Sequence, residues 1–154
     1  MPRRSVVRVV LSALAALAGV SALAAAQEAF SSAPTTSGCQ QSAASLCLNG
    51  GRFQVTANWK TPDGTTGAGN AVPLTDDSGY FWFFNDSNTE MVVKVLNGCG
   101  LNNSYWVFAA GLTNVQVNWQ VLDTQTNVTY PQVNPQGIAF APVQATTAFP
   151  TSCP

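Results

Sequence analysis

The side chains that most often perform catalysis are scarce in this chain of 154 residues. It has no histidine, so the commonest general base and the usual partner of a nucleophilic serine or cysteine are absent. A pair of carboxylates can hydrolyse a glycosidic bond, and five acidic residues stand as candidates: Asp76, Asp77, Asp86, Glu90 and Asp123. All five fall at expected turns or strand ends, where acidic side chains are solvated or cap the backbone. We therefore predict no catalytic residue and no enzyme, with a carboxylate glycoside hydrolase as the remote alternative.

Metal and cofactor chemistry is equally poorly supported. Asp76-Asp77-Ser78 could offer oxygen ligands to calcium, but it lacks the regular spacing of a known calcium loop, so we interpret it as a plain turn. A zinc site would need histidine or a Cys-x-x-Cys pair, and the chain has neither. The sequence predicts no metal and no cofactor.

The four cysteines, Cys39, Cys47, Cys99 and Cys153, are best explained as two disulfides. Three connectivities exist, and we favour Cys39–Cys47 with Cys99–Cys153, because this pairing ties both irregular tails to the sheet. On the chain-entropy model the short loop contributes about 2.6 kcal/mol and the long loop about 4 kcal/mol. The spacing alone leaves the other two connectivities open.

The first 26 residues have the pattern of a secretory signal peptide. A basic start is followed by an apolar run over 9–20 and by small residues at Ala22, Ala24 and Ala26. The arginines at 3 and 4 also loosely fit a twin-arginine signal, so both the Sec and the Tat route remain open. We predict a secreted or periplasmic protein with a signal peptide over 1–26, an extended leader over 27–46 and one β-sandwich domain over 47–154.

The net charge of the mature chain limits the classes of partner that it is expected to bind. Three basic and seven acidic residues remain after position 26, which gives a net charge of −4. Arg52, Lys60 and Lys94 are too few and too scattered to follow a phosphate backbone or to hold an anionic membrane. We therefore expect neither nucleic acid nor membrane as a partner once the signal is cleaved.

Short strands separated by turns dominate the rest of the chain. Apolar and polar residues alternate over 52–60 and 114–123, and further strands are expected over 69–74, 80–84, 90–96, 105–110 and 128–133. The segment 138–154 holds three prolines and predicts an irregular tail with one edge strand. The fold class is all-β: an immunoglobulin-like antiparallel β-sandwich of about seven strands, stapled by disulfides.

The aromatic residues suggest a binding surface. If 80–84 pairs with 90–96 through a short loop, Tyr80, Trp82 and Phe84 share the core with Met91, Val93 and Val95. The opposite face then carries the candidate ligand-binding residues Phe81, Phe83, Lys94, Trp106 and Phe108. Exposed rings of this kind stack on sugars or anchor the apolar groups of a protein.

This face allows two functional readings of the domain. It predicts a non-catalytic binding or accessory module, whose partner is an extracellular polysaccharide or another exported protein. The alternative is a structural or assembly domain without a small-molecule ligand, in which the chain's own tails cover the second aromatic face. The exposure of that face decides between them.

Several runs resemble an uncharacterised family of bacterial exported domains. They are LCLNGGRF at 46–53, TGAG at 66–69, AVPLT at 71–75, GYFWFF at 79–84, VVKVL at 92–96, WVF at 106–108 and GLT at 111–113. The resemblance covers almost all of the mature chain. It implies export and β structure, and it supplies no activity or catalytic residue.

Overall fold

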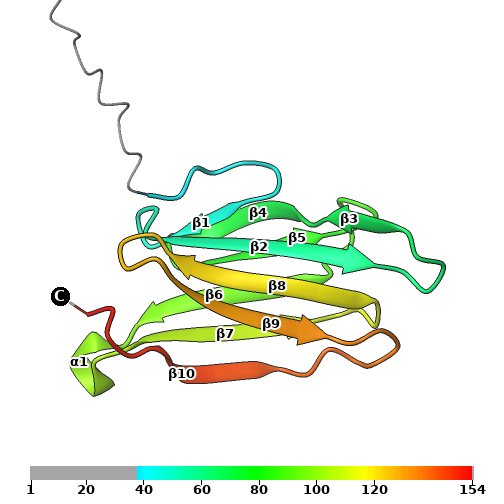
Figure 1. Cartoon of the computed structure of the whole chain (residues 1–154). Coiled ribbons are helices and arrows are strands. Elements are labelled where there is room, and N and C mark those ends of the chain that lie inside the picture. Colours follow the sequence, from blue (N-terminus) through cyan, green and yellow to red (C-terminus); the bar gives the residue numbers. More distant parts are fainter. Residues whose placement is uncertain (1–37, 154) are drawn as a thin grey trace, which may run out of the picture. The chain divides into compact units, whose positions relative to one another are not determined.

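The computed structural model describes residues 38–153, which form two antiparallel sheets packed together (Figure 1). The predicted sandwich and both predicted disulfides, Cys39–Cys47 and Cys99–Cys153, are confirmed. Ten strands build the sandwich, more than the seven or so expected from the sequence. The predicted signal peptide and residues 27–37 of the predicted leader lie outside the described residues.

The first sheet is organised around one long central pair. It contains β1 (Leu46–Leu48), β2 (Phe53–Lys60), β3 (Thr66–Ala68), β8 (Gln116–Asp123) and β9 (Val128–Asn134). β2 pairs with β8 along its whole length, from Phe53 opposite Asp123 to Lys60 opposite Gln116. β1 and β3 follow each other along the other edge of β2, while β9 pairs with β8.

The second sheet has the strand order β10-β7-β6-β5-β4. Its members are β4 (Asn70–Thr75), β5 (Ser78–Trp82), β6 (Met91–Asn97), β7 (Tyr105–Gly111) and β10 (Val143–Phe149). The edge strand expected in the C-terminal tail is therefore present as β10. A one-turn helix, α1 (Cys99–Asn102), which the sequence did not predict, lies between β6 and β7. Within residues 38–153 no helix is long and apolar enough to cross a membrane.

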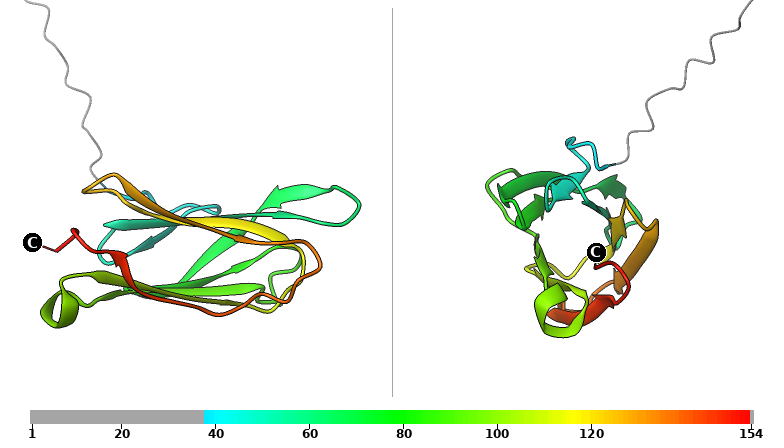
Figure 2. Two further views of the ribbon diagram at one scale, coloured as in Figure 1. Left: turned by 60° about the horizontal axis from the view of Figure 1, so that its bottom comes forward. Right: turned by 90° about the vertical axis from the view of Figure 1, so that its left-hand side faces the viewer.

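The two sheets approach each other at both sides, as the end-on view in Figure 2 shows. β1 lies beside β4 on one side and β9 beside β10 on the other. The Ala71 N–H of β4 also donates to the Ala43 carbonyl, just before β1, at 2.7 Å. The core between the sheets consists of alternate residues of the central strands, such as Phe53, Val107 and Val121, which are fully buried.

The loops gather at two opposite ends of the sandwich. What we call the stapled end carries both disulfides, α1 and the turn from β8 to β9, on the left in Figure 1. What we call the open end carries the loops β2–β3, β5–β6, β7–β8 and β9–β10. Clustered loops at the end of a sandwich are a common place for binding sites.

Candidate binding surface

The outer surface of the second sheet, which we call the aromatic face, carries aromatic and aliphatic side chains with a few polar ones among them. Cross-strand pairing places Val72, Tyr80, Val92 and Ala110 in one row and Ser78, Lys94, Phe108 and Gln144 in the next. Leu96 and Trp106 extend it towards the stapled end, and Trp82 extends it towards the open end. No described segment crosses this face, because the C-terminal segment joins the sheet edge as β10.

Two of the five predicted ligand-binding residues are not on this face. Phe81 pairs with Met91 and both side chains are fully buried, while Phe83 is only 4% exposed. The prediction that both phenylalanines lie outside was therefore wrong, and so was the placement of Tyr80 and Trp82 in the core. The structure does bring together the other three predicted residues, which are Lys94, Trp106 and Phe108.

The error comes from the length of one loop. The predicted register requires a short connection between the strands, whereas the loop from β5 to β6 runs over residues 83–90. Asn85 stabilises this loop because its side-chain oxygen accepts the Ser87 N–H at 2.9 Å. The longer loop shifts the register by an odd number of residues, which exchanges the two faces of β5. Phe84, also predicted in the core, leaves the sheet and is 51% exposed.

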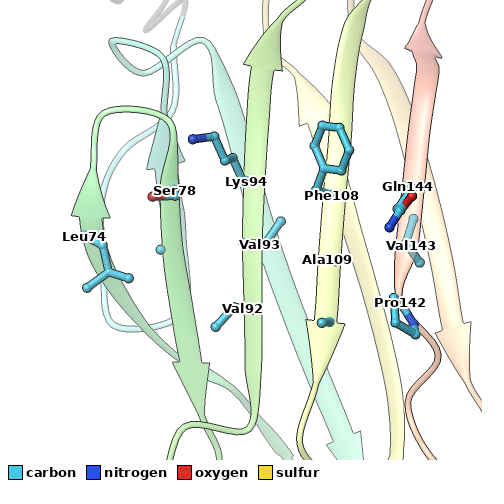
Figure 3. Close-up of a pocket in the computed structure, with 12 residues that line it drawn as sticks. Leu74, Ser78, Val92, Val93, Lys94, Phe108, Ala109, Pro142, Val143 and Gln144 are labelled. Carbon is cyan, nitrogen blue, oxygen red and sulfur yellow. The ribbon is translucent and has the colours of Figure 1, made fainter.

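A shallow hollow of about 300 Å³ lies in the aromatic face (Figure 3). Leu74 stands at one side and Pro142 at the other, with Val92 and Phe108 between them. The hollow exists because two small residues of the outer face, Ser78 and Ala110, occupy positions between these larger side chains. Its volume suits a single large apolar side chain or a small ligand.

One ion pair borders the hollow. Lys94 Nζ lies 3.0 Å from Asp77 Oδ2, and both side chains are partly exposed. The hydrogen bonds from Thr75 and Lys94 lower the pKa of the Asp77 carboxyl. Because solvent screens an exposed pair, it contributes about 0 to 1 kcal/mol to stability, and its main effect is to place a charged rim beside an apolar surface. Asp77 thus belongs to a structured turn, in agreement with the interpretation of 76–78 from the sequence.

The two aromatic rings of β7 are held at an angle to each other. The Trp106 and Phe108 ring centroids are 6.3 Å apart and the ring planes cross at 69°. Two contacts fix the Trp106 side chain. Its Nε1 donates to Asn102 Oδ1 at 2.7 Å. Its indole packs on Gly98, where a Cβ would come within 2.2 Å of the ring. These rings form walls and edges, and they do not form a flat platform.

The outer surface of the first sheet, which we call the polar face, has a different character. Amide and hydroxyl side chains face each other across β2 and β8, with Thr56 opposite Gln120 and Asn58 opposite Asn118. The β9 residues Pro131 and Val133 add exposed apolar side chains opposite Gln120 and Asn118. A few exposed aliphatic side chains among polar ones are normal, whereas a face with several aromatic rings is uncommon on a monomer.

The candidate acidic residues are scattered over different loops and strands. Asp123 is fully buried and forms two hydrogen bonds with Arg52, at 3.2 and 2.9 Å. Burial raises the pKa of the Asp123 carboxyl, but the hydrogen bonds from Arg52, Ser152 and the Gln125 N–H outweigh this and bring it to about 2. Asp76 accepts the Gly50 N–H at 2.8 Å and so caps the β1–β2 turn.

The other two acidic candidates belong to the β5–β6 loop. Asp86 is exposed, and Glu90 is buried beside Asn88. Among residues 38–153 no three histidine, cysteine, aspartate or glutamate side chains come together where they could hold a metal ion.

Comparison with known proteins adds no relative: no family model, no curated protein and no solved structure matches this chain.

Proposed function

We propose that this domain is a non-catalytic binding module whose aromatic face receives an apolar side chain of another exported protein. The observation that carries the proposal is a surface with several aromatic and aliphatic side chains, hollowed at its centre, with no described segment above it. A large apolar side chain inserted into a pocket of this kind is the usual anchor of a protein interface, and a polar rim such as Lys94–Asp77 sets its orientation.

A protein partner fits this face better than a polysaccharide. Sugar rings stack on aromatic rings that lie flat and parallel to the surface. The 69° angle between Trp106 and Phe108 prevents the two rings from stacking on one flat sugar chain. The partly buried side chains of Tyr80 and Trp82 instead add apolar area around the hollow, as in the centre of protein interfaces.

The chain offers a matched pair of variants to test this proposal. Val92→Asp places a charge beside the hollow, and Val133→Asp places the same charge on the polar face; the two valines are 41% and 61% exposed. Both variants are applied, with the unmodified protein, to an array of short peptides of random sequence. We expect selected peptides to be rich in Trp, Phe and Leu, with binding lost in Val92→Asp and kept in Val133→Asp.

Other results of the same comparison would overturn the proposal. Equal binding by both variants would show that the aromatic face is not the contact surface. Retention on cellulose, chitin or cell-wall preparations that is lost only in Val92→Asp would replace the protein partner with a polysaccharide. Sedimentation showing a dimer that only Val92→Asp dissociates would replace it with self-assembly, the structural alternative.

A further inference from the structure

The open end contains a second hollow, separate from the aromatic face and chemically different from it. Its volume is about 550 Å³, and it lies where the β5–β6, β7–β8 and β9–β10 loops meet. The residues that give it its character are Phe84, Glu90, Leu112, Thr113, Asn114 and Phe140. We call it the Glu90 hollow, because a buried carboxylate is its distinctive feature.

The acidic residue Glu90 is held firmly and is only 3% exposed. Its N–H donates to the Phe81 carbonyl at 2.9 Å, and its carbonyl accepts the Leu112 N–H at 2.8 Å. Its Oε1 accepts a hydrogen bond from the Asn88 side chain. The backbone of Glu90 is therefore fixed between Phe81 of β5 and Leu112 just after β7, and Asn88 holds its carboxylate.

The carboxylate itself lacks a compensating cation. Within residues 38–153 the ion pairs are Arg52–Asp123 and Lys94–Asp77, so Glu90 has no cationic partner there. The Oε2 atom of Glu90 has no hydrogen-bond partner within residues 38–153. Every side-chain oxygen of this part of the chain that is shielded from solvent does have a partner. Oε2 must therefore be reached by solvent, and the hollow that Glu90 lines provides the access. Solvent is thus the remaining partner of Oε2 within residues 38–153, and a cation that enters the hollow can replace it with a charge-assisted hydrogen bond.

The walls of the hollow are apolar and well supported. Phe140 packs over Gly111, where a Cβ would come within 2.3 Å of the ring, and stacks on Trp119 with centroids 6.5 Å apart. Phe84 packs edge-on against Trp59 at 4.8 Å and keeps half of its surface free. Leu112 is 76% exposed at the rim. These walls suit an aliphatic stem and an aromatic contact for a cation.

We propose that the Glu90 hollow binds an alkylammonium group, with the ammonium on the Glu90 carboxylate and its aliphatic stem against Phe84 and Leu112. Such a group is present in the lysine side chain of a partner chain and in a free linear diamine. The net charge of −4 on the mature chain favours the approach of a cation. This inference stands independently of the proposed function, because the aromatic face and the Glu90 hollow share no lining residue.

The test uses nitrogen-15-labelled protein titrated with n-butylammonium and followed by amide chemical shifts. We expect shifts in residues around the Glu90 hollow, and a loss of affinity of about tenfold to a hundredfold in Glu90→Gln, because the charge-assisted hydrogen bond is removed. Asp86→Asn is the matched control, since it removes the same charge from an exposed position in the same loop. It should bind like the unmodified protein. Equal shifts with the neutral analogue n-butanol, or unchanged affinity in Glu90→Gln, would overturn the proposal.

A second variant protects the test against misfolding of Glu90→Gln. Leu112→Lys keeps Glu90 and supplies an ammonium from the rim of the hollow, so it should block n-butylammonium; undiminished binding in this variant would contradict the proposal. Titration with a blocked lysine amide and with a linear diamine then distinguishes the two sources. Preference for the lysine amide assigns the site to a partner chain, and preference for the diamine assigns it to a free amine.

Discussion

At the stapled end Asp123 is fully buried and Arg52 neutralises it through two hydrogen bonds, whereas at the open end Glu90 is 3% exposed and takes one hydrogen bond from an amide. The Arg52 guanidinium also lies 4.5 Å above the Tyr105 ring and donates to the Ser152 carbonyl, which ties the C-terminal segment to β2 and β8. The charge of Arg52 is therefore paired within the fold. The Glu90 carboxylate, in contrast, has no cationic partner among residues 38–153.

The difference teaches that the two ends of this small domain pair their charged groups in different ways. The stapled end concentrates both disulfides and the buried ion pair, so its groups satisfy each other. The open end has neither a disulfide nor an ion pair among residues 38–153, and its loops surround a hollow whose carboxylate, Glu90, has no cationic partner in that part of the chain.

The largest expected effect is the loss of the long disulfide. Replacing Cys99 and Cys153 by serine should lower the free energy of unfolding by about 4 kcal/mol, because the bridge closes a long loop in the unfolded chain. Replacing Cys39 and Cys47, eight residues apart, should cost about 2.6 kcal/mol. Urea unfolding of both double variants measures the difference. A smaller loss from the long loop than from the short one would contradict the idea that the C-terminal staple dominates this end.

The next largest effect concerns Phe83, a buried side chain near the open end. Phe83 is buried against Gly69 and Trp59, so Phe83→Ala should cost about 3 kcal/mol through the cavity it leaves. Its neighbour Trp82 lies on the aromatic face, and Trp82→Ala should cost about 1 kcal/mol or less. Thermal and urea unfolding report both values. The reverse order would mean that the register of β5 is the one first expected from the sequence.

The third effect follows from the low pKa of Asp123. A carboxylate whose folded pKa of about 2 lies below its ordinary value stabilises the fold above pH 4 and loses that contribution as the pH falls through 2. We expect about 2 kcal/mol to disappear between pH 5 and pH 2. Urea unfolding across this range should show a flatter pH dependence in Asp123→Asn than in the unmodified protein. Parallel profiles would show that the ion pair does not control acid stability.

The smallest effect is also the one of opposite sign. Glu90→Gln removes a buried charge that has no cationic partner within residues 38–153, so the free energy of unfolding should stay equal or rise by up to about 1 kcal/mol. Asp123→Asn, in contrast, leaves Arg52 without its partner and should destabilise the fold. Unfolding curves at pH 7 compare the two. A loss above about 2 kcal/mol in Glu90→Gln would show that this carboxylate has a structural role.

Much of the fold was predictable because its strands carry clear local signals. The alternation over 52–60 and 114–123 identified β2 and β8, since each strand turns one side chain in two towards the core. The turn residues between them separated the remaining strands. The disulfide pairing was predicted on the physical ground that loose tails need anchoring, and both bridges form.

The candidate site was predicted only in part, because the run Tyr80–Phe84 has no alternation. Five consecutive aromatic residues indicate a strand but cannot say which of them point inward. The loop over 83–90 determines which residues of β5 face the core, and the length of this loop depends on local turns such as the one at Asn85. The Glu90 hollow could not be found from the sequence either, since it is formed by loops that only the assembled sandwich brings together.

The order of strands along the chain also has a consequence for how quickly this domain folds. In chain order, β1 to β3 belong to the first sheet and β4 to β7 to the second. β8 and β9 belong to the first sheet again, and β10 belongs to the second. The pairing of β2 with β8 therefore joins Val55 to Val121 although strands β3 to β7 lie between them in the chain. Neither sheet is a continuous segment, so neither can complete itself first. Such distant pairings slow folding to roughly milliseconds to seconds, and we expect a single cooperative step with no stable half-sandwich.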